Sequence, residues 1–256
     1  MSQEETKTGK YIYCVISCNE PRKFATLGIG ERGDEVYTLP HLDLAAVISD
    51  SPLASYESSR RNMMAHTLVL EEVMREFTIL PVRFGTVAPT AEAISEKLLK
   101  RRHDELSALM NEIEGRVELG LKAFWYEESL FQEIVDENPS IRDFRDSLAN
   151  LSPQQSYYDR IRLGEMVEKK LREKREAEAE SIMAHLSPIA CRSKANSTIS
   201  DRMILNAAFL VDKSREPEFD REVNRLDEEK GHLEMFKYVG PAPPYNFVNL
   251  VVNWNE

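Results

Sequence analysis

Hydrophobic and polar positions in the first part of the chain predict a domain of strands and helices. Residues 11–16, Tyr-Ile-Tyr-Cys-Val-Ile, are typical of a strand that is apolar on both faces and therefore central in its sheet. Residues 35–39 and 42–49 predict two more strands. Apolar side chains recur at helical spacing over residues 58–77, on a stripe formed by Met63, Thr67, Leu70, Met74 and Phe77.

An extended segment and further helices complete this part of the chain. Residues 79–87 are expected to be extended, with Pro81 at an edge or at a strand end. Residues 90–114 are expected to be helical, and Gly115 follows them as glycine often follows the end of a helix. We therefore place the end of the first domain at residue 115.

Residues 116–126 begin a second domain, and their apolar side chains recur at every second position. Their apolar side chains alternate with mostly polar ones, which indicates a half-buried strand. Two short helices are expected around residues 129–136 and 140–148, followed by a long helix that opens at Ser152-Pro153 and ends near Leu186. Its predicted stripe is Tyr157, Ile161, Gly164, Val167, Leu171, Ile182 and Leu186. Residues 169–180 have almost no large apolar side chain, so this part is expected to project into solvent or to cover a surface loosely.

The rest of the second domain continues the alternation of strands and helices. Strands are expected at residues 189–196, 201–212 and 232–239, with a helix at residues 216–230 between the last two. From residue 116 the order is strand, helices, strand, strand, helix, strand, which is the order of the ferredoxin-like fold. The predicted fold class is α+β, with an N-terminal α+β domain (1–115), an elaborated ferredoxin-like domain with inserted helices (116–240) and a C-terminal tail (241–256).

The tail has a pattern of its own. Residues 240–245 contain three prolines, so they are expected to form a stiff linker that cannot continue the preceding strand. Beyond them Val248, Leu250, Val252 and Trp254 share one face of an extended chain. Because such a face promotes aggregation when exposed, the tail is expected to pack back and hold the two domains together. The alternative is that this face stays open for a partner.

Charge and composition narrow the classes of partner. The chain has 256 residues, of which 42% are hydrophobic and 30% charged, and its net charge is -11. Nucleic acids and anionic lipids both attract clusters of Lys and Arg, so this acidity argues against either as a partner. No apolar run is long enough to span a bilayer, and the first ten residues lack the apolar core of a signal peptide. The cytoplasm is therefore the expected compartment.

One glycine motif suggests a cofactor site, but its context does not fit. Gly28-Ile29-Gly30-Glu31-Arg32-Gly33 matches the dinucleotide-binding pattern G-x-G-x-x-G. That mechanism requires the glycines to open a helix, whose N-terminus holds the pyrophosphate. Here the strand-like residues 35–39 follow instead, so a turn between strands explains the glycines and no cofactor is expected.

The remaining candidates give no catalytic or metal site. The chain has five histidines, at His41, His66, His103, His185 and His232. None belongs to a zinc-binding pattern, so surface or capping roles are expected. The cysteines, Cys14, Cys18 and Cys191, are expected to be buried as small hydrophobic residues, and Cys14 and Cys18 lie too far apart on a strand for a disulfide. The sequence therefore assigns no catalytic, cofactor-binding, metal-binding or interaction residue.

Two further readings involve charged partners. Arg83, beside Phe84-Gly85, is a candidate for anion binding, but an ion pair at a strand end is favoured in so acidic a chain. An RNA-binding ferredoxin-like domain needs exposed aromatic and basic side chains on its sheet. The strand at residues 201–212 offers only Phe209, so RNA binding is disfavoured.

Several segments together resemble a known family. They are Tyr11-Ile12-Tyr13, His66 with Val69-Leu70-Glu71, Leu80-Pro81-Val82-Arg83-Phe84-Gly85-Thr86-Val87, Gly115-Arg116-Val117-Glu118 running into Trp125, Leu205-Asn206-Ala207-Ala208-Phe209-Leu210-Val211, and Gly240-Pro241-Ala242-Pro243-Pro244-Tyr245-Asn246-Phe247. In this order, and over nearly the whole chain, they resemble the GvpF/GvpL family of gas vesicle proteins, and GvpF most. The motifs at residues 81–86 and 240–247 are the most specific pair.

The resemblance implies a minor, non-enzymatic component of gas vesicles, which are hollow shells built mainly from a small hydrophobic subunit, GvpA. It implies a place at the vesicle shell in the cytoplasm, with GvpA and other accessory proteins as partners, and neither cofactor nor catalytic residues. Two roles fit: a shell-bound element of nucleation or assembly, or a soluble holdase-like chaperone that prevents GvpA from aggregating. The alternative from another class is a small-ligand enzyme, which needs a deep pocket with titratable groups of shifted pKa.

Overall fold

The computed structural model describes residues 8–254, except for the side chains of residues 127–129, 131 and 132. It contains two compact units: Met1–Glu118 with Pro241–Glu256, and Leu119–Gly240. The tail is thus part of the first unit. Of the polar N-terminus and the tail end, residues 1–7 and 255–256 lie outside the described residues. Within the described part of the chain, no helix has the length and apolar character to cross a membrane.

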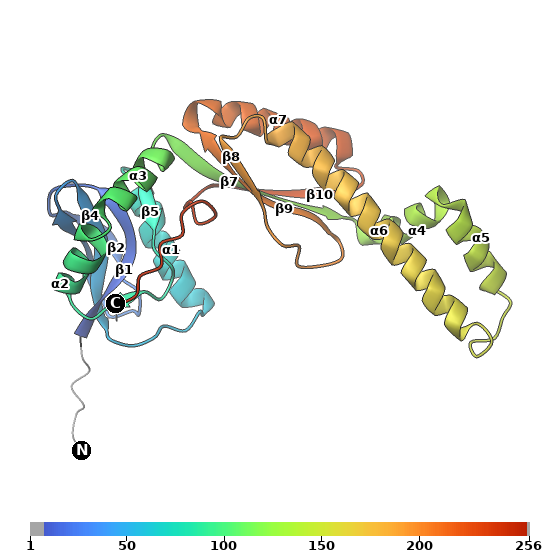
Figure 1. The fold of residues 1–256 in the computed structure, drawn as a ribbon, viewed down its shortest axis with the longest axis horizontal. Coiled ribbons are helices and arrows are strands. Elements are labelled where there is room, and N and C mark those ends of the chain that lie inside the picture. Colours follow the sequence, from blue (N-terminus) through green and yellow to red (C-terminus); the bar gives the residue numbers. More distant parts are fainter. Residues whose placement is uncertain (1–7, 255–256) are drawn as a thin grey trace, which may run out of the picture. The chain divides into compact units, whose positions relative to one another are not determined.

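An antiparallel sheet forms the centre of the first unit (Figure 1). Its strands are β1 (Thr8–Ser17), β2 (Lys23–Leu27), β3 (Glu35–His41), β4 (Leu44–Pro52), β5 (Ile79–Pro81) and β6 (Val87–Ala88). The order is β2-β3-β4-β1-β5, with β6 also beside β1, so β1 is interior as its pattern predicts. The sequence pattern misses β2, because this edge strand has no buried residue and only alternate partly buried ones.

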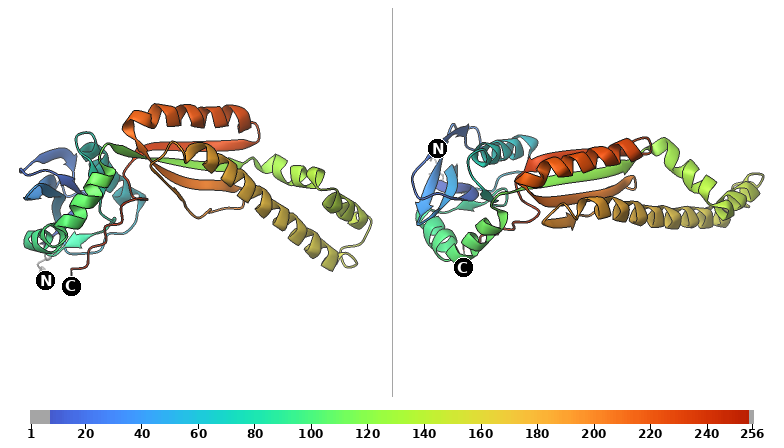
Figure 2. Two further views of the ribbon diagram at one scale, coloured as in Figure 1. Left: turned by 45° about the horizontal axis from the view of Figure 1, so that its top comes forward. Right: turned by 90° about the horizontal axis from the view of Figure 1, so that it is seen from above.

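Helices cover both faces of this sheet. They are α1 (Arg60–Met74), α2 (Ala91–Ala93), the π-helix η1 (Ile94–Lys100) and α3 (His103–Ile113). Figure 2 shows α1 on one side of the sheet and the α2–α3 segment on the other. The buried side of α1 carries His66, Val69, Leu70 and Val73. The predicted stripe is therefore only partly right, because Met63 and Thr67 lie on the exposed side and the polar His66 takes a core position.

The second unit is built on a four-stranded sheet in the order β10-β7-β9-β8. The elements in chain order are β7 (Arg116–Trp125), α4 (Glu127–Glu137), α5 (Pro139–Leu148), α6 (Tyr157–Leu186), β8 (Arg192–Ala195), β9 (Met203–Asp212), the 3-10 turn η2 (Lys213–Arg215), α7 (Glu216–Lys230) and β10 (Glu234–Ala242). β7 and β9 are neighbours in one sheet, as a ferredoxin-like arrangement requires. α6 and α7 contact each other and β9. Phe209 of β9 is buried against Phe219 of α7, with ring centroids 5.1 Å apart, so it offers no stacking surface to RNA.

Several element boundaries differ from the sequence prediction. Residues 79–87, expected to be extended throughout, form β5 and β6 with a turn at residues 83–86 between them, which the positive φ of Gly85 permits. α6 begins at Tyr157 rather than at Ser152-Pro153, because residues 153–156 form a turn in which the Ser156 N–H donates to the Ser152 carbonyl at 3.0 Å. β10 continues through Gly240-Pro241-Ala242, although these residues were expected to break the strand. The reason is that β10 is an edge strand, where a proline without an N–H is tolerated.

The middle of α6 is held more firmly than its composition indicates. The Lys174 ammonium lies 2.9 Å from a Glu133 carboxylate oxygen of α4, and Lys230 of α7 pairs with Glu178. The N-terminal turns of α6 are the exposed part instead, because Tyr157 and Ile161 of the predicted stripe are 59% and 47% exposed. The predicted stripe thus becomes buried only from Leu171 onward.

Candidate functional site

The glycine motif lies in the loop between β2 and β3, as a turn between strands requires. Gly30 and Gly33 have φ angles of 91° and 74°, which favour glycine. A Cβ atom at Gly28 would lie 2.7 Å from the Ser49 Oγ atom, so only glycine fits there. Chain conformation and close packing therefore explain these glycines without a nucleotide.

We expect Gly28→Ala to lower the free energy of unfolding by about 1–3 kcal/mol, because the new methyl group overpacks a tight contact. Gly164→Ala is the matched control: a Cβ atom there meets nothing within 4 Å, and the residue lies inside a helix. This control should raise stability by about 0.5–1 kcal/mol. Urea unfolding of both variants of the full chain measures the effects, and equal effects of the two substitutions would contradict the packing argument.

The three cysteines are free, and two of the histidines lie beside carboxylates: His103 is 2.7 Å from Asp43 and His185 is 3.0 Å from Glu222. Cys14 is buried, but Cys18 is only partly buried and Cys191 is exposed, so the prediction that all three are buried is wrong for two of them. Cys191 lies in the short connection before β8, outside any core. Among the described residues, no three His, Cys, Asp or Glu side chains gather to hold a metal ion.

His66 is the exception to the expected surface histidines, because it is only 3% exposed. Its Nδ1 atom lies 3.0 Å from the Tyr11 hydroxyl oxygen, and its Nε2 atom lies 2.6 Å from the Tyr245 hydroxyl oxygen. The Tyr13 ring stacks on the imidazole, and the Phe84 ring meets it edge-on. Burial lowers the pKa of His66 to about 4, so the imidazole is neutral at pH 7.

The hydrogen bonds of this cluster form a chain in which each group donates to the next, from the Gly85 N–H to Tyr245. The Gly85 N–H donates to the Tyr11 hydroxyl oxygen at 2.9 Å. Tyr11 is fully buried, and His66 Nδ1 is the acceptor within reach of its O–H, so Tyr11 donates to His66. The single proton of the neutral imidazole is then on Nε2 and is donated to the Tyr245 oxygen. The Tyr245 O–H remains free to donate to another group.

A groove of about 400 Å³ opens beside this cluster, and we call it the His66 groove. It is lined by Met63, His66, Thr67, Pro81, Arg83, Phe84, Tyr245, Val248, Asn249 and Leu250. None of these residues carries a carboxylate. Arg83 is exposed, and among the described residues it forms no ion pair, which contradicts the favoured prediction of an ion pair at a strand end. The groove therefore combines an apolar wall with neutral polar side chains and one cation, Arg83.

Two local structures position the groove residues. Residues 83–86 form a β-turn in which the Thr86 N–H donates to the Arg83 carbonyl at 3.3 Å and Gly85 has a φ of 82°. This turn exposes Arg83 and aims the Gly85 N–H at Tyr11. In the tail, the N–H groups of Phe247 and Val248 donate to the Pro244 carbonyl at 3.1 and 2.9 Å. The resulting helical turn places Tyr245 over His66.

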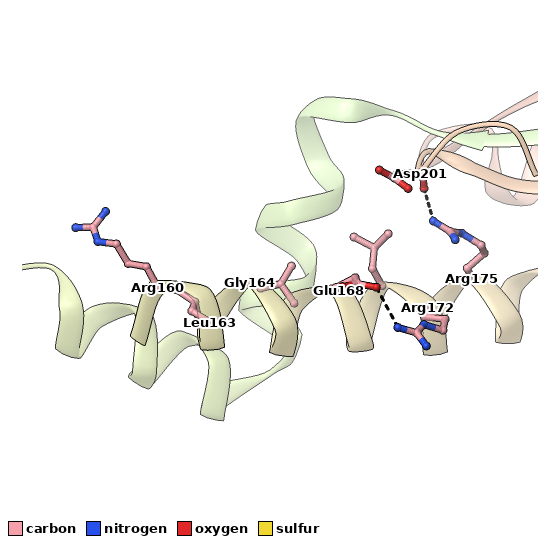
Figure 3. Close-up of a pocket in the computed structure, with 9 residues that line it drawn as sticks. Arg160, Leu163, Gly164, Glu168, Arg172, Arg175 and Asp201 are labelled. Carbon is pink, nitrogen blue, oxygen red and sulfur yellow. Dashed lines mark hydrogen bonds and ion pairs between the residues drawn. The ribbon is translucent and has the colours of Figure 1, made fainter. Parts of the chain in front are cut away.

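A second hollow, of about 660 Å³, follows α6 in the second unit (Figure 3). Its lining residues are Arg160, Leu163, Gly164, Val167, Glu168, Leu171, Arg172, Arg175 and Asp201. The Arg175 guanidinium donates to the Asp201 carbonyl at 2.6 Å, and Arg172 pairs with Glu168 at 3.0 Å. This surface combines apolar and charged side chains, and each of these two arginines already has a partner within the unit.

Comparison with known proteins identifies the family of the chain. The family model described as gas vesicle synthesis protein GvpL/GvpF matches residues 9–249. The chain belongs to this GvpL/GvpF family. Gas vesicle protein F of Streptomyces sp. (strain CB03234) is 30% identical over 240 residues, covering 93% of this chain and 98% of that protein. Gas vesicle protein F of Dolichospermum flosaquae is 26% identical over 242 residues, covering 94% and 97%.

Solved structures of GvpF share the fold. The crystal structure of GvpF from Anabaena sp. PCC7120 superposes with a TM-score of 0.83 at 26% identity, covering 95% of this chain and 99% of that one. GvpF from Microcystis aeruginosa gives a TM-score of 0.78 at 27% identity, covering 94% and 99%. The mixed α and β fold is thus that of GvpF, and the protein has a role related to gas vesicle assembly.

Three of the segments that carry the GvpF/GvpL resemblance meet at the His66 groove. The segment at residues 80–87 supplies Arg83 and Phe84, the first helix supplies His66, and the tail supplies Tyr245. Tyr11, from a fourth segment, lies beneath them. The sequence identified these segments but not that they meet. His66 and Tyr245 are far apart in the sequence and come together only in the folded protein.

Proposed function

We propose that this GvpF/GvpL protein is a minor structural and assembly component of gas vesicles that binds the major shell subunit GvpA during nucleation or assembly. Membership of the family is the observation that carries the proposal. Exposed apolar side chains support it, since contiguous apolar surface often marks a partner site. Met63, Met64 and Leu68 of α1 are 45%, 54% and 50% exposed, and Met63 also lines the His66 groove.

The direct test is retention of purified GvpA by the immobilised full chain at moderate salt. We expect GvpA to be retained well above the level of an unrelated acidic protein of similar net charge. Fractionation of vesicles complements this test: a shell component stays with washed, intact vesicles. Background retention of GvpA, with both proteins folded, would contradict the proposal.

A holdase role is the second candidate, and the methionines of α1 favour it. Methionine side chains are flexible and adapt to varied apolar partners. A holdase would keep GvpA from aggregating and would be recovered in the soluble fraction rather than with washed vesicles. Light scattering of GvpA with and without this protein distinguishes a holdase from a shell component.

A catalytic role receives no support from the groups in the His66 groove. His66 and Tyr245 do have shifted pKa values, since burial lowers the pKa of His66 to about 4 and raises the pKa of Tyr245. Both shifts move the pKa further from pH 7, so at that pH His66 is unprotonated, Tyr245 is protonated, and both side chains are uncharged. They act as hydrogen-bonding groups, which suits binding rather than proton transfer.

A further inference from the structure

The His66 groove has an unusual electrostatic character for this chain. The protein carries a net charge of -11, yet every polar side chain that lines the groove is neutral or cationic. Arg83 is exposed and, among the described residues, has no ion-pair partner. A guanidinium beside an apolar wall is complementary to a carboxylate that is attached to an apolar group.

The hydrogen-bond chain beneath the groove adds a second donor. Gly85 N–H, Tyr11 and His66 donate in sequence toward Tyr245, at distances of 2.9, 3.0 and 2.6 Å. Because the Tyr245 oxygen already accepts from His66, its own O–H is the group left to serve a ligand. Hydrogen bonds in such a chain polarise one another, which makes the last donor stronger. The tyrosine therefore prefers an anionic acceptor to a neutral one.

The size and lining of the groove fit a single side chain of a partner rather than an extended partner surface. Its volume of about 400 Å³ lies within the usual range of small ligand sites. Met63, Phe84, Val248 and Leu250 supply the apolar walls. The ligand is thus expected to present one apolar group and one carboxylate close together.

We propose that the His66 groove is the docking site for a carboxylate-bearing apolar segment of the shell subunit, with Arg83 and Tyr245 as the two groups that bind the carboxylate. This inference rests on the proposed function, and it names the surface and the chemistry of recognition. Its parts can be tested separately, first with a small probe and then with GvpA.

The probe experiment titrates hexanoate and hexanamide into the full chain and follows backbone amide resonances by NMR. Hexanoate should shift the resonances of Gly85 and Asn249 and bind about tenfold more tightly than hexanamide, because only hexanoate forms a charge-assisted contact. Arg83→Gln should weaken hexanoate about tenfold and leave hexanamide unchanged. Tyr245→Phe should weaken both probes, by about fivefold for a lost hydrogen bond.

The control variant is Arg75→Gln, which removes an exposed arginine that directly follows α1 and does not line the groove. It should leave both affinities unchanged. Equal binding of hexanoate and hexanamide, no binding of either, or equal losses in Arg83→Gln and Arg75→Gln would each overturn the carboxylate site.

GvpA retention then tests the occupant. Arg83→Glu should reduce retention by about tenfold or more, since it reverses the charge, while Arg75→Glu should not. Unchanged retention by Arg83→Glu would overturn GvpA as the occupant even if hexanoate binds. Absence of retention by the unaltered chain would instead contradict the proposed function, and the hexanoate titration would still decide the chemistry of the groove.

Discussion

Truncation of the chain after Tyr245 should destabilise the first unit by about 5 kcal/mol, which is comparable to the whole net stability of a domain. The reason is that Phe247, Val248 and Leu250 are buried within this unit, at 8%, 2% and 2% exposure. The truncation also removes Asn246, whose backbone N–H and side-chain amide donate to the buried Glu118 carboxylate at 2.9 and 2.6 Å. Hydrogen exchange of α1 and β1 amides measures the loss of protection.

The second unit supplies an internal reference for this experiment. Amides of α7 and β9 should keep their protection, because the deleted residues belong to the first unit. Val251→Ser is the matched control, since this tail residue is 47% exposed and its replacement should change stability by less than about 0.5 kcal/mol. If the truncated chain keeps its stability and loses only GvpA retention, the tail is an open binding element and the packing argument is wrong.

Acidification should destabilise the protein through His66. The folded pKa of this histidine is lowered to about 4 by burial, whereas the unfolded chain takes up the proton near pH 6.5. Between these values the unfolded state binds more protons, so stability falls as the pH decreases from about 6.5 to 4. The full shift corresponds to about 3 kcal/mol, most of which should be lost by pH 4.5.

His66→Gln is the variant that isolates this effect. Glutamine keeps a donor and an acceptor but does not titrate, so the variant should be less stable at pH 7 and should show a flatter dependence on pH. Carboxylates with lowered pKa values, such as Glu72 and Glu105, are the same in both proteins and cancel in the difference. Parallel urea-unfolding free energies of the two proteins from pH 7.5 to 4.5 would contradict a buried neutral His66.

Periodicity predicted the elements that bury an apolar face. The interior position of β1, the alternation in β7 and the burial of Val248 and Leu250 follow from side-chain patterns alone. β2 was missed because an edge strand without a buried side shows little contrast between its faces. The predicted start of α6 was several residues too early, because serine followed by proline favours a turn as well as a helix N-terminus.

The candidate site could not be predicted from hydrophobic periodicity. A histidine within an amphipathic helix breaks the apolar stripe, so the pattern assigned His66 to the surface. Only the partners from β1 and the tail, Tyr11 and Tyr245, make its burial favourable. The signal available in the sequence was that each of these residues stands in a segment that resembles the GvpF/GvpL family.

The discontinuity of the first unit has a consequence for how the protein is made. Residues 1–118 leave the ribosome first, but their unit also needs residues 241–254, which are synthesised after the whole of the second unit. The first unit therefore cannot be completed until the second has been synthesised, and up to that point the site of Tyr245 over His66 is unfilled. Until then the apolar floor beneath the tail is open to water and to chaperones. The protein thus acquires its groove last, and only chains translated through the tail can present it.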